Sequence, residues 1–596
     1  MERVADYVVR KINEAGADHI FMISGRGILY LTDAVAKNKN ICPVSTYHEQ
    51  GASYAAMAYA AARNTIAACL VSTGCAATNA VTACLCAYQD NLPVIFISGN
   101  NILSENTRHT GVPIRTYGQQ EADIIAIVKS CTKYAVMLDS EVDVVHEVEK
   151  AIYIAQNGRK GPVWIDIPLD VQNKRIDDNL ADHFEVKEKN INEKYLEEYA
   201  QVVSTKLNHS TRPILLLGGG CKAYSDEARR LVAQYQIPIV FSPAACDVYG
   251  TVNPLSIGAV GSIGGSRAGN FSIQNSDFIL AIGTKLSSQL TGRKSVFARQ
   301  AEIIVVDTDP HEHKKNGVDI HTVINADAGM FLTLLSKQKL FPVNVEWLKK
   351  CLHWKEKFSL KNEKFIKELR KKNILDIHEV ANIISHKLPL EATIITDAGF
   401  EELIIPSTID YADGHRCLFP ANQGAMGYAI PAIIGAYKAG CKNILCLVGD
   451  GSIMMNIQEM GIISDMHIPV KIFVINNNMY AIIRRRQQDL FRRRTVGNDP
   501  SDGLASPDFS KIASCFGFKY DCMEELSSFE SGIEKVFKET SPMLIEVICT
   551  QEQKYLHESY TINEKRRVVH RPIEDMSPFL DRETIKQEMI IDMVPE

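Results

Sequence analysis

Two oxygen-bearing side chains stand at the ends of two predicted strands in one strand–helix–strand segment of this chain. The segment contains an apolar run, a run with apolar residues at helical spacing and a second apolar run: Ile444–Val448, Ile453–Met466 and Val470–Ile475. Asp450 follows the first strand in Gly-Asp-Gly, and Asn477 follows the second in Asn-Asn. A crossover of this length makes the strands parallel and neighbouring, so both side chains are expected at the carboxyl edge of an open α/β sheet.

The chemistry of these two side chains suits a metal ion that holds a diphosphate. Carboxylate and amide oxygens are hard ligands, which Mg²⁺ and Ca²⁺ prefer, and Mg²⁺ keeps its other positions for water and phosphate oxygens. Gly449 and Gly451 flank Asp450 and leave room for phosphates to approach the backbone. The alternative interpretation is that Gly-Asp-Gly is an ordinary turn.

A Gly-Asp-Gly followed by Asn-Asn at the end of the next strand resembles the cofactor fingerprint of thiamine diphosphate enzymes. The resemblance implies that Gly449, Asp450, Gly451 and Ser452 contact the cofactor. It also implies that Asp450, Asn477 and the backbone carbonyl of Met479 bind Mg²⁺, and that Asn477 and Met479 belong to the cofactor site.

Apolar runs separated by helical patterns predict an α/β protein with three doubly wound parallel-sheet domains. The expected domains are residues 1–175, 196–335 and 373–555, with a charged linker to about residue 195, a lysine-rich helix over about 345–372 and a tail at 556–596. The expected buried strands are His19–Ile23, Ala67–Ser72, Val94–Ser98 and Val163–Ile167, then Pro213–Leu217, Pro238–Phe241, Phe278–Ile282 and Ile303–Val306, then Thr393–Thr396, Ile444–Val448, Val470–Ile475 and Met543–Val547.

Composition narrows the class of protein. The net charge of -6 gives no reason to expect nucleic acid or a membrane surface as a partner. The 15 cysteines include no C-x-x-C pair and several lie in apolar runs, which indicates reduced thiols in the cytoplasm. No basic-then-apolar leader and no long apolar span is seen, so a cytoplasmic enzyme that acts on small molecules is expected.

The first predicted domain carries a glutamate at the start of a helix of small residues. By itself, Glu49 could be a residue that the helix dipole favours. Its surroundings and the segments STGCAATN, AYQDNLPVIFISG, QQEAD and GPVWIDIP resemble the pyrimidine-binding domain of the acetolactate synthase-like group. The resemblance implies that Glu49 hydrogen-bonds the aminopyrimidine ring and that this hydrogen bond activates the cofactor. It also implies that Gln120 contacts the reacting centre.

The third predicted domain contains QGAMGY, which resembles the G-x-M-G-Y segment of the same family. Gly424 and Met426 are therefore expected to bind the cofactor, with the methionine side chain between its rings; a plain core methionine is the alternative. In this family the active site lies between subunits. Glu49 of one chain and Asp450 of another would then form one site, in a homodimer or homotetramer.

The chain departs from acetolactate synthases at several positions. Lys285 and Gln289 stand where the family has arginines of its flavin-contacting segment, and the second of these arginines binds the carboxylate of the incoming 2-keto acid. A neutral amide there removes a strong charge-assisted pair. The other departures are Ser24-Gly25-Arg26 for Pro-Gly-Gly, Phe400-Glu401 for Gln-His, and Arg486 for the acceptor-selecting tryptophan.

Arg486 belongs to the first of two arginine triplets, residues 484–486 and 492–494. They could form a solvated basic helix face, or they could bind phosphate, which arginine forks suit. A keto-sugar nucleotide would supply both phosphates and an electrophilic carbonyl. Flavin-containing relatives of this kind build branched sugars, and the yersiniose carboligase is one example.

We therefore expect a thiamine diphosphate- and Mg²⁺-dependent transferase that decarboxylates a 2-keto acid, with pyruvate as the expected donor, and joins the acyl unit to a carbonyl acceptor. Acetolactate synthase is one alternative, and a hydrolase that cleaves the C–C bond of a cyclic dione is another. A non-enzymatic regulatory relative is a third. The sequence leaves open whether FAD, ADP or no nucleotide occupies the second domain, that is, whether the protein is a flavoprotein.

Overall fold

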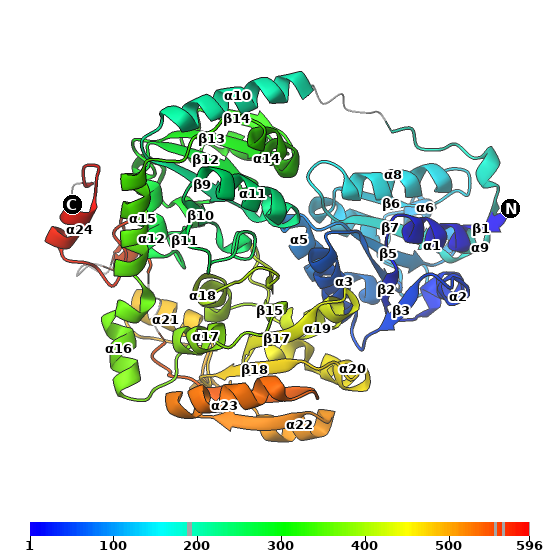
Figure 1. Cartoon of the computed structure of the whole chain (residues 1–596). Helices are drawn as coiled ribbons and strands as arrows, with labels where there is room; N and C mark the ends of the chain where they lie inside the picture. Colours follow the sequence, from blue (N-terminus) through cyan, green and yellow to red (C-terminus); the bar gives the residue numbers. More distant parts are fainter. Residues whose placement is uncertain (187–192, 554–556, 563–566, 595–596) are drawn as a thin grey trace.

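Three six-stranded sheets, in which every neighbouring pair of strands is parallel, form the frame of the chain (Figure 1). The computed structural model describes residues 1–186, 193–553, 557–562 and 567–594. Apolar runs in the sequence are buried on both faces of these sheets, as parallel strands covered by helices require. The predicted class, three parallel-sheet α/β domains, is confirmed.

The first sheet has the strand order β3-β2-β4-β5-β7-β6. Its strands are β2 His19–Met22, β3 Cys42–Ser45, β4 Ala67–Val71, β5 Val94–Asn100, β6 Tyr134–Met137 and β7 Val163–Pro168. Its helices are α1 Val4–Glu14, α2 Leu29–Lys37, α3 Glu49–Arg63, α4 Cys75–Asn79, α5 Val81–Gln89, α6 Thr107–Thr110, α7 Ile124–Val128, α8 Val144–Gln156 and α9 Leu169–Asn173. A short antiparallel pair, β1 Glu2–Arg3 with β8 Arg175–Ile176, joins the two ends of this domain.

The second sheet has the order β11-β10-β9-β12-β13-β14, which is 3-2-1-4-5-6 in chain order, the arrangement typical of dinucleotide-binding folds. Its strands are β9 Pro213–Leu217, β10 Ile239–Phe241, β11 Ser256–Ala259, β12 Phe278–Ile282, β13 Glu302–Asp307 and β14 Thr322–Asn325. Its helices are α10 Glu193–His209, α11 Ser225–Tyr235, α12 Arg267–Gln274, α13 Ser288–Thr291 and α14 Ala328–Ser336, and α15 Val345–Lys357 and α16 Lys364–Lys371 follow.

The third sheet repeats the topology of the first. Its order, β16-β15-β17-β18-β20-β19, is 2-1-3-4-6-5 in chain order, as in the first sheet. Its strands are β15 Ala392–Thr396, β16 Arg416–Leu418, β17 Lys442–Gly449, β18 Lys471–Asn476, β19 Lys519–Met523 and β20 Met543–Ile548. Its helices are α17 Ile377–Ser385, α18 Phe400–Thr408, α19 Ala429–Lys438, α20 Met460–Asp465, α21 Ala481–Leu490, α22 Phe509–Phe516 and α23 Leu526–Lys538.

Two predicted helices are wrong in their continuity. The helix expected over 345–372 is broken between α15 and α16 by a 3-10 turn at Leu360–Asn362. The helix expected at Ile453–Met466 is a 3-10 segment, Ile453–Glu459, followed by α20. Asn456 has non-helical dihedrals because its side chain donates to the carbonyl of Gly427, 2.8 Å away, which bends the segment.

The first and third domains meet through α3 and α19, which are buried against each other. Both helices carry small residues at the crossing, and each follows the second strand of its own domain. A β-carbon on Gly435 would lie 2.0 Å from the carbonyl oxygen of Ala55, so the backbones touch. Tyr54 and Tyr428 pack edge to face beside this crossing, with ring centroids 5.5 Å apart.

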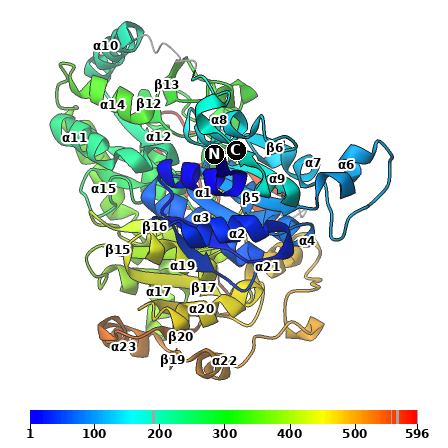
Figure 2. The same ribbon diagram turned by 90° about the vertical axis from the view of Figure 1, so that its right-hand side faces the viewer.

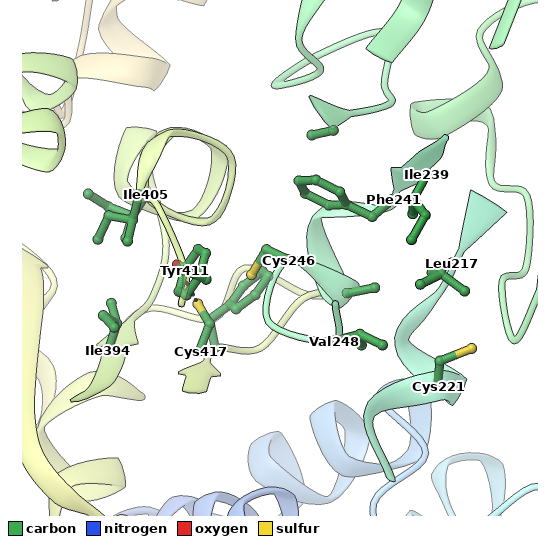
Figure 3. Packing of buried hydrophobic residues seen from close by; sticks show 14 of the residues in the cluster. Leu217, Cys221, Ile239, Phe241, Cys246, Val248, Ile394, Ile405, Tyr411 and Cys417 are labelled. Atoms are coloured by element: carbon green, nitrogen blue, oxygen red, sulfur yellow. Dashed lines mark hydrogen bonds between the residues drawn. The ribbon is translucent and has the colours of Figure 1, made fainter. Parts of the chain in front are cut away.

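The second and third domains share one hydrophobic cluster (Figure 3). Leu217 and Phe241, at the ends of β9 and β10, belong to it together with Cys246, and Tyr411 and Cys417 belong to it from the third domain. The Tyr411 hydroxyl donates to Cys417 Sγ at 3.2 Å. This continuous core fixes the position of the second domain on the third.

The carboxyl-terminal segment runs beside α12, α15 and α21 and contains β21 Tyr560–Ile562, β22 Val568–His570 and α24 Arg582–Glu588 (Figure 1). Arg267 of α12 is 1% exposed and donates to the carbonyls of Met576 and Pro578. Trp354 of α15 donates to Glu588 at 2.9 Å. Part of the predicted tail, residues 556, 563–566 and 595–596, lies outside the described residues, as do residues 187–192 of the predicted linker.

On the opposite side of the molecule, α6 and its flanking loops project from the first domain (Figure 2). Among the residues that the structure describes, no helix is both long enough and apolar enough to cross a bilayer.

The helix crossing gives a first prediction. Gly435→Ala should lower the free energy of unfolding by about 1–3 kcal/mol, because the added methyl group meets backbone, which has no rotamer to change. Gly532→Ala is the matched control: this helical glycine faces only the flexible methyl group of Met523, and alanine favours helix by about 0.5–1 kcal/mol. Urea unfolding measures both. If Gly435→Ala were as stable as the parent protein, the backbones of α3 and α19 would not be in contact at this position.

Candidate functional site

Asp450 and Asn477 lie at the carboxyl ends of neighbouring strands, as the sequence predicts. β17 and β18 are paired in parallel, with Gly449 opposite Ile475, and the backbone N–H of Asp450 donates to the carbonyl of Ile475 at 3.1 Å. Two backbone N–H groups of the next loop, those of Asn478 and Met479, hydrogen-bond the Asp450 carboxylate. The structure therefore brings together the three residues expected to bind metal.

The donor set at this edge fits a divalent cation. The Asp450 carboxylate also accepts hydrogen bonds from Ser506 Oγ at 2.7 Å and from the Gly451 N–H at 2.8 Å. Burial raises the pKa of Asp450, an effect that a nearby cation would oppose. Asn477 Oδ1 is buried and has no hydrogen-bond partner in the part of the chain that the structure describes, so it can bind a metal ion. Within the described residues, no group of three His, Cys, Asp or Glu side chains has the arrangement of a metal centre, so amide and backbone oxygens are needed here.

The loop that contains Gly424 and Met426 is fixed against the same edge. Ser452 Oγ donates to Asp397 at 2.7 Å and accepts from the Gly427 N–H at 2.9 Å. The Ser452 hydroxyl is therefore already bonded within the protein, which leaves its backbone for a cofactor. Met426 directly precedes Gly427 and is partly exposed.

A buried acidic pair, for which the sequence predicted no role, lies beside this loop. Burial raises the pKa of Asp397 to about 7, and burial, with the charges of Asp397 and Asp450, raises the pKa of Glu401 to about 8. A β-carbon on Gly449 would lie 3.3 Å from Glu401 Oε1, so this carboxyl group faces the Gly-Asp-Gly turn. The only signal in the sequence was the replacement of Gln-His by Phe-Glu at positions 400 and 401.

The residues predicted in the first domain gather at the carboxyl edge of its own sheet. Glu49 is the first residue of α3, and its carboxylate accepts from Asn79 Nδ2 at 2.9 Å. Asn79 ends α4, and Gly74 precedes α4. A β-carbon on Gly74 would lie 2.0 Å from the carbonyl oxygen of Gln120, so the Gln120 backbone packs against this turn. The Gln120 side chain is exposed.

Glu49 and Gln120 lie at the edge of the first sheet, whereas Asp450 and Asn477 lie at the edge of the third. The turn before Glu49 packs on the third domain, because the Glu459 carboxylate accepts from the N–H groups of Tyr47 and His48 at 3.2 and 3.0 Å. In the part of the chain that the structure describes, however, no hydrogen bond joins Glu49 or Gln120 to Asp450 or Asn477.

The first arginine triplet lies on α21, directly after the candidate metal-binding loop. Arg484 Nε donates to Asp499 at 2.8 Å, and Arg485 pairs with the buried Glu558 of the carboxyl-terminal segment. These two arginines therefore stabilise the position of α21. Arg486 is exposed, and no ion pair to it is found among the described residues, so it remains available to a ligand.

A cavity of about 610 Å³ lies where the three domains meet. It is lined by the glycines that follow β9 and β12, by Asp307 and Asp327 near the ends of β13 and β14, and by Lys285 and Gln289. Asn422 of the third domain accepts from Lys285 and donates to Asp90 of the first at 2.6 Å. Glu402 also lines the cavity, and burial raises its pKa to about 8.

Comparisons with known proteins agree with this arrangement. Residues 2–127 match the model of the N-terminal thiamine pyrophosphate-binding domain of thiamine pyrophosphate enzymes, residues 200–335 match the central domain, and residues 397–547 match the C-terminal binding domain. The chain belongs to the thiamine pyrophosphate-dependent enzymes of the acetolactate synthase type.

Its relatives resemble it over nearly their whole length. The acetolactate synthase large subunit of Cyanidium caldarium is 31% identical over 90% of this chain and 92% of its own. The large subunit of Lactococcus lactis subsp. lactis is 28% identical over 92% and 93%. The chloroplastic acetolactate synthase 2 of Zea mays is 28% identical over 93% and 86%.

The strand-end geometry gives a second prediction. Asp450→Asn should reduce the rise in Tm produced by thiamine diphosphate plus Mg²⁺, because an anionic oxygen ligand is lost. Asp465→Asn, at an exposed position of α20, is the control and should keep the full rise. Thermal unfolding with cofactor, with and without Mg²⁺, measures this. A full rise for Asp450→Asn would place the metal elsewhere.

Proposed function

We propose that this chain is a Mg²⁺-dependent carboligase that decarboxylates pyruvate and joins the remaining two-carbon unit to a carbonyl acceptor. In this reaction the bond between the carboxylate and the keto carbon breaks, CO₂ leaves, and a new C–C bond forms to the acceptor carbonyl, whose oxygen takes up a proton. The observation that carries this proposal is Asn477 Oδ1, which has no hydrogen-bond partner among the described residues and follows the strand next to that of Asp450, in a thiamine pyrophosphate-binding domain.

The residues have separate roles in this proposal. Asp450, Asn477 and the carbonyl of Met479 bind Mg²⁺, and Gly424, Met426, Gly449, Gly451 and Ser452 line the cofactor. Thiamine diphosphate, when bound, would supply the electron sink that decarboxylation of a 2-keto acid needs. Glu49, whose carboxylate is oriented by Asn79, holds the proton that activates the cofactor, and Gln120 contacts the reacting group.

A second copy of the chain completes each site in this proposal. Glu49 and Gln120 lie at one sheet edge and Asp450 at another, without a hydrogen bond between the two groups in the described residues. Exposed apolar side chains in the loops at both edges offer surface for such a contact: Leu29, Tyr47, Val112, Tyr117, Met454 and Met455. We infer a homodimer as the minimum active unit, and a homotetramer is a dimer of such units.

The acceptor proposed is a keto-sugar nucleotide. Gln289 places a neutral amide in the cavity, and Arg486 offers an exposed guanidinium next to the candidate metal loop. Acetolactate synthase is the second candidate, favoured by the names of the relatives, and 2-acetolactate would then be the product. A dione hydrolase would release no CO₂ from pyruvate, which separates it from both carboligases.

The cavity of the second domain supports a dinucleotide such as FAD. The 3-2-1-4-5-6 strand order, the glycines at the β9 and β12 ends, and the two carboxylates Asp307 and Asp327 suit a pyrophosphate and ribose hydroxyl groups. The Asp307 carboxylate is held in place by His313 Nε2 at 3.0 Å on one oxygen and by the backbone N–H of Asp309 at 2.9 Å on the other.

For the reaction itself, Glu49→Gln should retain the bound cofactor but slow exchange of its reactive C2 proton by about 100-fold or more, because an amide does not transfer the proton. Exchange is followed by NMR on the bound cofactor, and CO₂ release from pyruvate should fall in parallel. Glu198→Gln, at an exposed position of α10, serves as the control. Exchange at the parental rate would remove Glu49 from this role.

Arg486→Ala tests the acceptor. It should lower kcat/KM for an anionic keto-sugar nucleotide by about 10- to 100-fold, or about 1.4–2.7 kcal/mol, because a charge partner of the phosphates is lost. Products from pyruvate and a panel of sugar nucleotides are identified by mass spectrometry. Arg230→Ala, at an exposed position on α11, is the control. If acceptor KM and product ratio do not change, Arg486 is only a solvated side chain of α21.

A further inference from the structure

Arg26 lies at the carboxyl edge of the first sheet, in a turn that has little freedom to move. It begins a 3-10 turn, Arg26–Ile28, after β2. A β-carbon on Gly25 would lie 2.4 Å from Ser72 Oγ, and one on Gly27 would lie 1.8 Å from Thr73 Oγ1. The glycines on both sides of Arg26 therefore pack against the end of β4, and the Arg26 side chain points away from this packed surface into solvent.

The Arg26 guanidinium carries an unneutralised charge. Its Nη1 donates to Gln119 Oε1 at 2.7 Å, which is a neutral partner. Among the described residues, no carboxylate lies within ion-pair distance of Arg26, whereas Arg3, Arg10 and Arg63 of the same domain all have such partners. An arginine fork with most of its donors unused is suited to a carboxylate or a phosphate.

The loop that orients Arg26 is itself held in place. Asn101, a buried residue, donates to the carbonyl of Gln119 at 2.8 Å. The carboxylate of Glu121 accepts from the Tyr117 and Gly118 N–H groups at 3.0 and 3.3 Å. Gln119 can therefore aim the guanidinium from a fixed position.

Arg26 also lies on the same edge as the residues proposed for catalysis. Gln120 follows Gln119 and packs against Gly74, which precedes α4, and Asn79 at the end of α4 donates to Glu49. Any substrate that meets Glu49 and Gln120 thus approaches a free guanidinium on this face. Gln289, which lines the cavity, has a neutral amide where Arg26 has a charged guanidinium.

We propose that Arg26 binds the anionic group of the acceptor substrate, a phosphate or carboxylate, with Gln119 as its positioning residue. This inference rests on the carboligase function proposed above. The donor is the less suitable partner, because its carboxylate leaves as CO₂. An ion pair to that carboxylate would stabilise the ground state and raise the barrier to its loss, whereas a pair to the acceptor persists through C–C bond formation.

The test compares Arg26→Gln, Arg26→Lys and Gln119→Ala in the holoenzyme with pyruvate as donor. Two acceptors are used: a nucleoside diphosphate 4-keto sugar and the neutral aldehyde propanal. We expect Arg26→Gln to raise KM for the anionic acceptor by about 10- to 100-fold, with a much smaller change for propanal and for pyruvate. Arg26→Lys should recover part of the loss because it keeps the charge without the fork. Arg230→Gln is the control for a general loss of surface charge.

Direct binding makes the result independent of turnover. Calorimetry with UDP-glucose, which carries the diphosphate but no reactive ketone, should show the same loss of affinity in Arg26→Gln and a smaller loss in Gln119→Ala. The inference would be overturned if Arg26→Gln raised KM equally for both acceptors and left the affinity for UDP-glucose unchanged. So would a rise confined to the KM of pyruvate, which would assign Arg26 to the donor.

The failure of the inference and of the proposed function can be told apart. If the parent protein with thiamine diphosphate and Mg²⁺ releases no CO₂ from pyruvate, the carboligase function is wrong. If it releases CO₂ and joins the unit to an acceptor while Arg26→Gln retains the parental KM and UDP-glucose affinity, only the assignment of Arg26 is wrong.

Discussion

The close crossing of α3 and α19 is the contact that holds the first and third domains of the chain together. Gly435 and Ala55 let two helix backbones touch, and a side chain at this point would force the first and third domains apart. Glu49 is the first residue of α3, and the loop of Gly424 and Met426 leads directly into α19. One helix contact therefore fixes the first and third domains of a chain relative to each other, and in the proposed dimer each of these domains completes a site with the second copy.

Three buried carboxyl groups at the edge of the third sheet place a second, electrostatic requirement on the candidate site. Asp397, Glu401 and Asp450 are buried close together, and burial raises the pKa of each. Charging all three without a cation is unfavourable, since like charges in a poorly hydrated site repel one another. A divalent ion at Asp450 and Asn477 would offset that cost, so metal binding and the ionisation of the neighbouring carboxyl groups are coupled.

Much of this frame could be predicted because strands of parallel sheets are buried on both faces and read as apolar runs. Strands at sheet edges gave no such signal: β3 (Cys-Pro-Val-Ser) is mostly exposed, and β19 carries charged residues. The bend at Asn456 depends on the carbonyl of Gly427, and the ion pair of Arg485 on Glu558. Partners so distant in the sequence are set by tertiary packing, which a local pattern does not contain.

The shared 2-1-3-4-6-5 topology of the first and third sheets has a consequence for how the chain divides its labour. The helix after the second strand begins with an acid in one domain and follows a glycine-containing loop in the other. In the proposed function, the two copies of one architecture take unlike tasks: the first handles a proton and the third holds the diphosphate. New substrate preferences can then arise by changing the turns of one copy while the other keeps the cofactor chemistry intact.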